Sequence, residues 1–231
     1  MARIRQRIRQ MVWQAWMRKR MPAGRWLGVL MLLGSLFLGW AAPLLAAPAL
    51  SEADRGEVRR VESYLNGIKT LKSQFVQVSP DGSLVRGTFY LSRPGRMRLE
   101  YDPPIKDYVV ADGLFVFFWD DRMQQSSSTP IGATLADLLL RENLKLAGEV
   151  TVTRITRAPG ELEISLIQTD DPGKGELTFI FEDKPLRLRK WRVLDPQGLT
   201  TEVGLLGPQV GVALEKDLFY FKDPTLNRRR E

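Results

Sequence analysis

Hydrophobic and polar residues alternate with a period of two through most of the chain after residue 70. The clearest case is residues 87–104, G-T-F-Y-L-S-R-P-G-R-M-R-L-E-Y-D-P-P, which predict two strands joined by a tight turn. Residues 93–95 form the corner, because Pro presets φ and Gly tolerates positive φ. In the second strand, one face carries charged residues and the other carries Met97, Leu99 and Tyr101. The hairpin predicts a curved sheet with one apolar face.

The same period predicts strands along the rest of the chain. The run 114–119, L-F-V-F-F-W, is almost wholly apolar, so we expect both of its faces to be covered. Together the strands predict an antiparallel meander of about ten or eleven members, spaced as in a barrel or a strongly curled sheet. The first strand includes Phe75 and Gln77, and after the hairpin the expected strands are 106–111, 114–119, 122–126, 150–157, 161–169, 175–182, 186–194 and 200–206.

Helical periodicity appears in two places. Residues 51–69 predict an amphipathic helix capped by Ser51. Its apolar stripe consists of Val58, Val61, Leu65 and Ile68. Residues 126–130 predict a loop, and a short helix opens near Thr134 with a leucine-rich face. So short a helix needs an apolar surface to lie on, and it fits either a lid or a connecting helix packed in the core.

The ends of the chain have distinct compositions. Residues 215–221 predict a short segment whose apolar side chains pack inward, namely Leu218, Phe219 and Phe221. Residues 1–49 predict a cleaved secretory signal, with a basic region, an apolar run and a small-residue stretch. Cleavage fits after Ala49 or after Ala46, and Met17 or Met21 can be the true start. An uncleaved membrane anchor is the alternative. The remaining residues, 50–231, predict a single exported domain.

Charge and composition narrow the class of protein. Eight of the 34 basic residues and none of the 27 acidic residues precede residue 50, so the body of the chain is near neutral. We therefore expect no nucleic-acid partner, despite the formal charge of +7. The sequence has no His and no Cys, and lacks a phosphate-binding loop motif. We expect no catalysis, no cofactor and no metal; the paired acidic residues at 120–121 and 170–171 fit turns.

Four segments in order resemble the LolA family of periplasmic carriers of outer-membrane lipoproteins. They are the helix leading into F-V-Q (65–77), the hairpin G-T-F-Y-L-S-R-P-G-R-M-R-L-E-Y, the run V-V-A-D-G-L-F-V-F-F-W-D (109–120), and the leucine-rich helix after Pro130. The terminal D-L-F-Y-F also fits, and the likeness spans most of residues 55–222. The resemblance implies an incomplete, half-open antiparallel β-barrel of about 11 strands with a helical lid over an apolar cavity.

The resemblance also assigns residues and partners. The lid-latching arginine of the family falls on Arg93, donating to lid carbonyls. At the mouth, where the family often has Phe, this chain has Met97. Acyl chains would lie against Met97, Leu99, Phe89, Leu91, Phe115, Phe117 and Trp119, beneath a lid that includes Leu135, Leu138 and Leu139. The implied partners are acylated lipoproteins, an inner-membrane lipoprotein-releasing ABC transporter and, where present, an outer-membrane receptor. The implied protein is a periplasmic monomer.

A second function remains open from the sequence. The same fold would suit a carrier of another lipid, or a domain that senses lipids or lipoproteins, because a fold does not fix a function. The related receptor is anchored through a lipidated Cys, and this chain has no Cys, so the resemblance favours the soluble carrier.

Overall fold

The computed structural model describes residues 50–225. The predicted leader, with its alternative start and cleavage positions, lies outside the described residues, as does the basic stretch 228–230. Within residues 50–225 no helix has the length and apolar character needed to cross a membrane.

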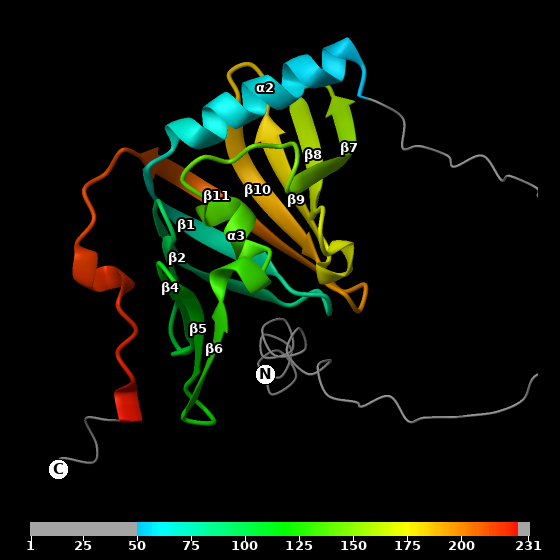
Figure 1. Cartoon of the computed structure of the whole chain (residues 1–231). Coiled ribbons are helices and arrows are strands. Elements are labelled where there is room, and N and C mark those ends of the chain that lie inside the picture. The colour runs from blue at the N-terminus through cyan, green and yellow to red at the C-terminus, as the bar shows by residue number, and fades with distance from the viewer. Residues whose placement is uncertain (1–49, 226–231) are drawn as a thin grey trace, which may run out of the picture.

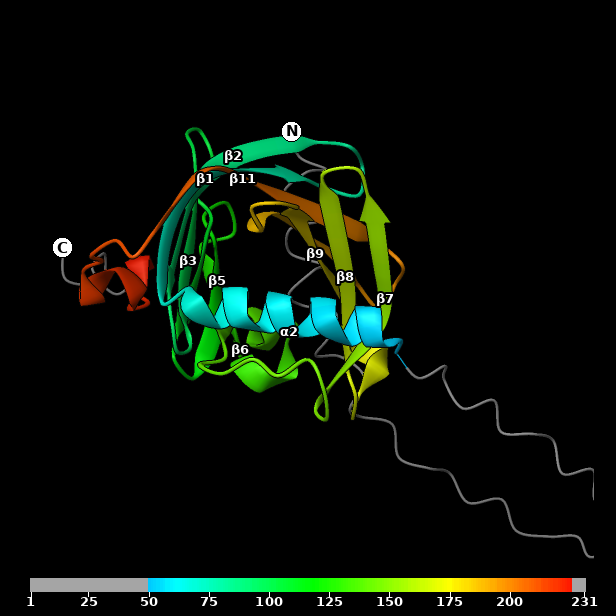
Figure 2. The same ribbon diagram turned by 90° about the horizontal axis from the view of Figure 1, so that it is seen from above.

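The described residues form one antiparallel sheet of 11 strands in the order β6-β5-β4-β3-β2-β1-β11-β10-β9-β8-β7. Figure 2 shows the strands arranged in a curve that stays open between the β6 and β7 ends. The half-open antiparallel barrel predicted from the sequence is confirmed. The strands are β1 (Thr70–Val78), β2 (Leu84–Ser92), β3 (Arg96–Tyr101), β4 (Tyr108–Asp112), β5 (Phe115–Asp120), β6 (Gln125–Pro130), β7 (Val150–Ala158), β8 (Glu161–Gln168), β9 (Glu176–Glu182), β10 (Arg187–Leu194) and β11 (Thr200–Val210).

Pairing between the first and last strands joins the two halves of the sheet. The chain runs from β1 to β6, crosses the open side, and returns from β7 to β11, which pairs with β1. The crossing contains the 3-10 turn η1 (Ile131–Ala133) and the helix α3 (Ala136–Leu140). Two further 3-10 turns are η2 (Pro172–Lys174) and η3 (Lys216–Phe219). The crossing therefore lies where the sheet does not close on itself.

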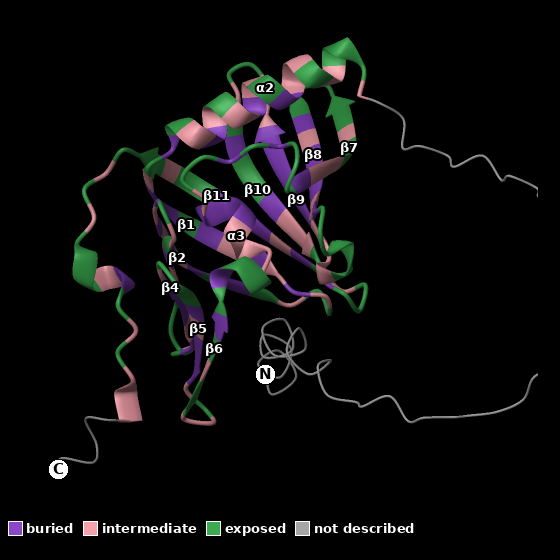
Figure 3. Cartoon of the chain, viewed as in Figure 1, coloured by how far each residue is buried: buried purple, intermediate pink, exposed green. Residues whose placement is uncertain are grey.

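The helix α2 (Glu52–Gly67) lies across the open side of the curve, as Figures 1 and 2 show. The side chain of Ser51 caps it by accepting a hydrogen bond from the Asp54 amide. Its predicted stripe faces the sheet, since Val58, Val61 and Leu65 are buried (Figure 3). Hydrogen bonds from Ser51 and Arg157 lower the pKa of Asp54, and the second of these links the start of α2 to β7.

Two sequence-based predictions were wrong about local structure. Residues 126–130, predicted as a loop, belong to β6, which pairs with β5 from Gln125 to Pro130, whereas the predicted strand 122–126 is largely a turn. A serine-rich edge strand has almost no apolar side chain to bury, so it carries no period-two signal, and it is recognised in the structure by its main-chain pairing with β5.

The terminal segment packs its apolar side chains onto the sheet, and Phe219 is buried. Residues 215–221 lie on the outer side of the curve, against β3, β4 and β5 (Figures 1 and 2). Phe221 stacks on Phe117 with ring centroids 4.8 Å apart, and the Tyr108 hydroxyl donates to the Lys222 carbonyl. The outer faces of β4 and β5 are themselves largely apolar, with Val110 and Trp119 buried, and they give the segment a place to pack.

Candidate functional site: the concave face and its helical cover

The concave face of β2 and β3 carries four of the residues predicted to contact acyl chains. Phe89 pairs with Leu99 and Leu91 pairs with Met97 across the antiparallel ladder, so all four lie on the same side of the sheet. Phe89, Leu91 and Met97 are buried and belong to the main apolar core, against which Leu99 packs while half-buried. Their place on the concave face follows the prediction; a role in acyl-chain binding stays a prediction.

Strand β5 presents the opposite face from the one predicted. Val116 and Phe118 join the main core, and they pair through β4 with the concave residues Ala111 and Val109. Successive side chains alternate across a strand, so Phe115, Phe117 and Trp119 lie on the outer face. Phe115 is 40% exposed, and Phe117 is covered by Phe221. The prediction that these three line the concave interior was wrong, because an all-apolar strand has no pattern to distinguish its faces.

Helix α3 rests on the core through its leucines. Leu138, Leu139 and Leu140 are buried, and Leu135 packs against the core while half-buried. The loop that follows α3 is tied to α2. The Asn66 side chain donates to the Leu144 carbonyl and accepts from the Leu144 amide, at 3.0 and 2.8 Å. Glu62 also accepts from the Leu146 amide. We call α2, η1, α3 and residues 141–146 the cover.

Arg93, in the turn between β2 and β3, joins the two helices of the cover. Its Nε donates to the carbonyl of Leu139 in α3 at 2.8 Å, and its Nη1 donates to the carbonyl of Leu65 in α2. The nearby Gly95 amide donates to the Leu140 carbonyl at 2.9 Å. Burial lowers the pKa of the Arg93 guanidinium to about 10, which leaves it charged at neutral pH. Arg93 thus makes the predicted contacts; its action as a latch stays a prediction.

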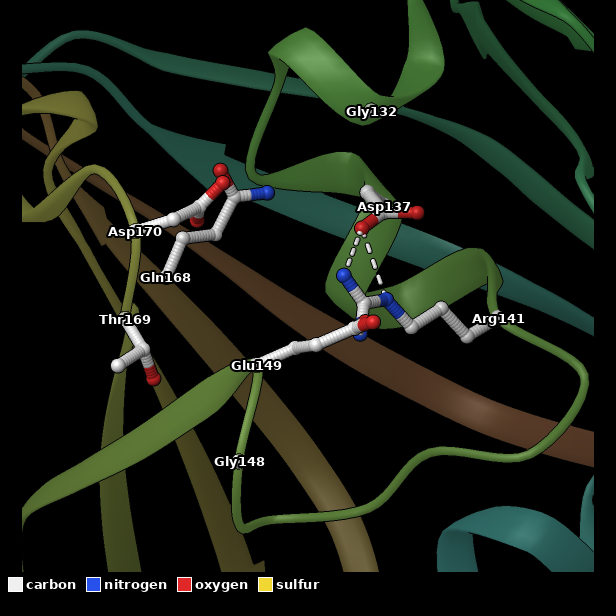
Figure 4. Close-up of a pocket in the computed structure, with 8 residues that line it drawn as sticks. All are labelled: Gly132, Asp137, Arg141, Gly148, Glu149, Gln168, Thr169 and Asp170. Atoms are coloured by element: carbon white, nitrogen blue, oxygen red, sulfur yellow. Dashed lines mark hydrogen bonds and ion pairs between the residues drawn. The ribbon is translucent and has the colours of Figure 1, made fainter.

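A pocket of about 420 Å³ with several charged and polar side chains in its lining lies between the cover and the β7–β8 end of the sheet (Figure 4). Arg141 donates to Asp137 of α3 and to Glu149, just before β7, at 2.5 and 2.7 Å. Gln168, at the end of β8, donates to the Thr134 carbonyl at 3.3 Å. The remaining lining residues are Gly132, Gly148, Thr169 and Asp170. This pocket was not predicted, although the spacing of Asp137 and Arg141 by four residues is typical of a helical ion pair.

The acidic pair at 120–121 makes hydrogen bonds in a turn. Asp120 accepts from the Met123 amide, and the Asp121 amide donates to Asp107. Among residues 50–225, no three His, Cys, Asp or Glu side chains are grouped so that they could hold a metal ion. The concave apolar face, the cover and Arg93 therefore make up the candidate site, and together they define a half-open antiparallel barrel closed on one side by helices.

One family model matches most of the chain. The family model described as outer membrane lipoprotein carrier protein LolA matches residues 66–222. This chain therefore belongs to the LolA family.

Individual relatives extend the likeness over most of the chain. The chain is 28% identical over 212 residues to the outer-membrane lipoprotein carrier protein of Methylococcus capsulatus, covering 88% of this chain and 96% of that protein. It is 27% identical over 194 residues to the protein of the same name from Azotobacter vinelandii, covering 78% and 93%. Among solved structures, a LolA superfamily protein from Nitrosomonas europaea aligns with a TM-score of 0.41 and 9% identity, covering 71% of this chain and 97% of that one.

Proposed function

We propose that this protein carries acylated lipoproteins through the periplasm, shielding their acyl chains against its concave face. The observation that carries the proposal is the cover, whose helices α2 and α3 are held over a buried apolar face by Arg93 through hydrogen bonds to main-chain carbonyls. Membership of the LolA family supports the same role, since relatives similar over most of their length are named outer-membrane lipoprotein carriers.

The energetics suit a shuttle. Burial of each CH₂ contributes about 0.8 kcal/mol, so one acyl chain of about sixteen carbons contributes on the order of 10 kcal/mol before costs. Each hydrogen bond that holds the cover contributes about 1 kcal/mol net. The burial of an incoming chain can therefore offset the loss of these hydrogen bonds. When no cargo is bound, the cover keeps a large apolar surface away from water, where it would promote aggregation.

The proposed carrier role implies a path from the inner membrane to the outer membrane. The predicted leader directs the chain to the periplasm and is removed there. The carrier accepts its cargo from an inner-membrane ABC transporter and delivers it to the outer membrane, through a receptor where one is present. The protein acts as a monomer and needs no cofactor, and its task is binding and transfer with no chemical step.

A release assay tests this function. Protein purified from the periplasm is added to spheroplasts that make a radiolabelled lipoprotein, and the label in the soluble fraction is measured. We expect soluble label with the acylated lipoprotein and none with its Cys→Ser form, which cannot be acylated. Arg93→Glu should abolish release because a carboxylate cannot donate to the Leu65 and Leu139 carbonyls. Arg96→Glu, an exposed arginine in the same hairpin, should preserve it.

Failure of release, from spheroplasts whose transporter works with another carrier, would contradict the proposal. The cargo would then be a different lipid, and mass spectrometry of material that copurifies with the protein would identify it.

The two faces of the sheet provide a second test. Leu99→Asn should weaken binding of a dipalmitoylated lipopeptide about tenfold, because it places a polar amide on the face where acyl chains lie. Phe115→Asn should leave binding within about twofold, since Phe115 lies on the outer face and is 40% exposed. Titration of a fluorescent lipopeptide measures both. Equal losses in the two variants would refute the assignment of the concave face as the acyl-chain surface.

A further inference from the structure

The guanidinium of Arg93 holds one donor that the closed cover does not use. Arg93 is 8% exposed, and its Nη2 has no hydrogen-bond partner among residues 50–225. A buried donor without an acceptor is costly, and such groups are rare in folded proteins. Holding the cover closed therefore does not explain why this Nη2 donor is buried without a partner.

The geometry of a guanidinium group places the unused donor beside a used one. Nε–H and one N–H of Nη2 point from the same edge of the planar group, whereas Nη1 points from another edge. Here Nε donates to the Leu139 carbonyl of α3, and Nη1 donates to the Leu65 carbonyl of α2. If α3 moves away while α2 stays, the edge formed by Nε and Nη2 becomes a free two-donor fork, still anchored through Nη1.

The acceptors already present indicate which chemistry fits this fork. Both partners of Arg93 are uncharged carbonyl oxygens, and among the described residues no carboxylate forms an ion pair with it. The residues that supply these carbonyls, Leu65 and Leu139, have buried apolar side chains. Acyl chains lying on the concave face would extend toward the core, so the carbonyl groups at their heads would lie at the rim, where the β2–β3 turn places Arg93.

We propose that the Nε–Nη2 edge of Arg93 binds an acyl-ester carbonyl of the cargo, taking the place of the Leu139 carbonyl when α3 moves. This inference rests on the proposed carrier function and names the part of the cargo that Arg93 recognises. The cargo and the cover then compete for the same donors of Arg93. When the ester carbonyl binds, it replaces the Leu139 carbonyl, so binding of the ester and opening of α3 occur together.

Two matched lipopeptides test the inference. One carries two palmitoyl esters on an S-glyceryl cysteine, and the other carries two hexadecyl ethers, which have equal chains and no carbonyl. The protein purified from the periplasm should bind the diester about tenfold more tightly than the diether. In Arg93→Leu the ratio should fall to about one, and in Arg96→Leu it should stay near ten, because Arg96 is exposed. Each ratio is taken within one protein, so a change in the stability of the cover cancels.

A second variant separates charge from geometry. Arg93→Lys keeps the positive charge and loses the two-donor edge, so the ratio should fall to about threefold. Circular dichroism establishes that each variant is folded.

Three results would overturn the inference. They are equal binding of diester and diether by the unaltered protein, a full ratio in Arg93→Leu, and tighter Arg93-dependent binding of dipalmitoyl phosphatidylglycerol than of the diester, which would assign the edge to a phosphate. If the unaltered protein bound neither lipopeptide, the carrier function itself would fail, and this inference would fail with it.

Discussion

Replacing Arg93 by leucine is expected to accelerate amide hydrogen exchange in α3 about thirtyfold in the protein without cargo. The substitution removes the hydrogen bonds that Arg93 donates to the Leu65 and Leu139 carbonyls, a loss of about 2 kcal/mol from the closed state of the cover. Because α3 has five residues and little stability of its own, this loss appears directly as local opening. Exchange measured by mass spectrometry or NMR at Leu138 and Arg141, whose amides bond within the helix, reports it.

Amide exchange in the sheet should change less than exchange in α3. The hydrogen bonds that Arg93 donates go to α2 and α3, and among the described residues none goes to β8 or β9. Amides of β8 and β9 should therefore keep their protection. Arg96→Leu, an equal change at an exposed position of the same hairpin, should leave α3 unchanged. Unaltered exchange in Arg93→Leu, or equal acceleration in Arg96→Leu, would show that Arg93 does not hold the cover closed.

Gly87→Ala is expected to lower the free energy of unfolding by about 3 kcal/mol. A Cβ on Gly87 would lie 1.9 Å from the Glu100 carbonyl oxygen in the neighbouring strand and 2.8 Å from the Phe75 ring. The first contact is with main chain, so β2 and β3 would have to separate to relieve it. Gly87 pairs with both Phe75 and Tyr101, whose rings meet edge to face with centroids 5.6 Å apart, and these rings fill the space that a side chain would need.

Gly204→Ala is the matched control. Gly204 is also a strand glycine, in β11, and a Cβ there would come no closer than 3.8 Å to the Val76 carbonyl oxygen. It should change the unfolding free energy by less than about 1 kcal/mol. Urea denaturation of the two variants gives both values. Similar losses at the two positions would mean that main-chain crowding does not set the cost at Gly87.

Where the sequence alternates, it predicted the structure well. In the hairpin of β2 and β3, Met97 and Leu99 alternate with Arg96 and Arg98, and the observed ladder places the two sets on opposite faces. The pattern placed Arg93 only in a turn, marked by Pro94 and Gly95, and its assignment as a latch came from the resemblance to the LolA family. The helix over 51–69 was recognisable from its cap and its stripe, and differs from α2 by one or two residues at each end.

Where a strand is uniformly apolar, the sequence could not show which side chains lie on the concave face and which on the outer face. All members of β5 except its last residue are apolar, so nothing local distinguishes Phe118, on the concave face, from Phe117, on the outer face. The difference comes from the partners of each side chain, since Phe117 is covered by Phe221, more than 100 positions away in the chain. Only the three-dimensional structure shows that the outer face is covered by the terminal segment.

Contacts between distant segments also explain why the pocket beside α3 was not predicted. Its walls come from η1, α3, the start of β7 and the end of β8, and single polar residues such as Gln168 and Glu149 contribute to it. Each of them looks like an ordinary loop or strand-end residue in the sequence. Their meeting depends on where the crossing from β6 to β7 places α3, which no local pattern encodes.

Because the sheet is open on one side, the diameter of the half-barrel is not fixed by its strand pairing. In a closed barrel, strand number and stagger fix the diameter. Here β6 and β7 end the sheet, and contacts between the crossing and the β7–β8 end are side-chain bonds such as Arg141 with Glu149 and Gln168 with the Thr134 carbonyl. The half-barrel can widen by exchanging such bonds for water, with its ladder intact. Under the proposed carrier function, cargo molecules of different cross-section would fit one chain, at a cost set by these polar contacts and by the apolar packing of α3.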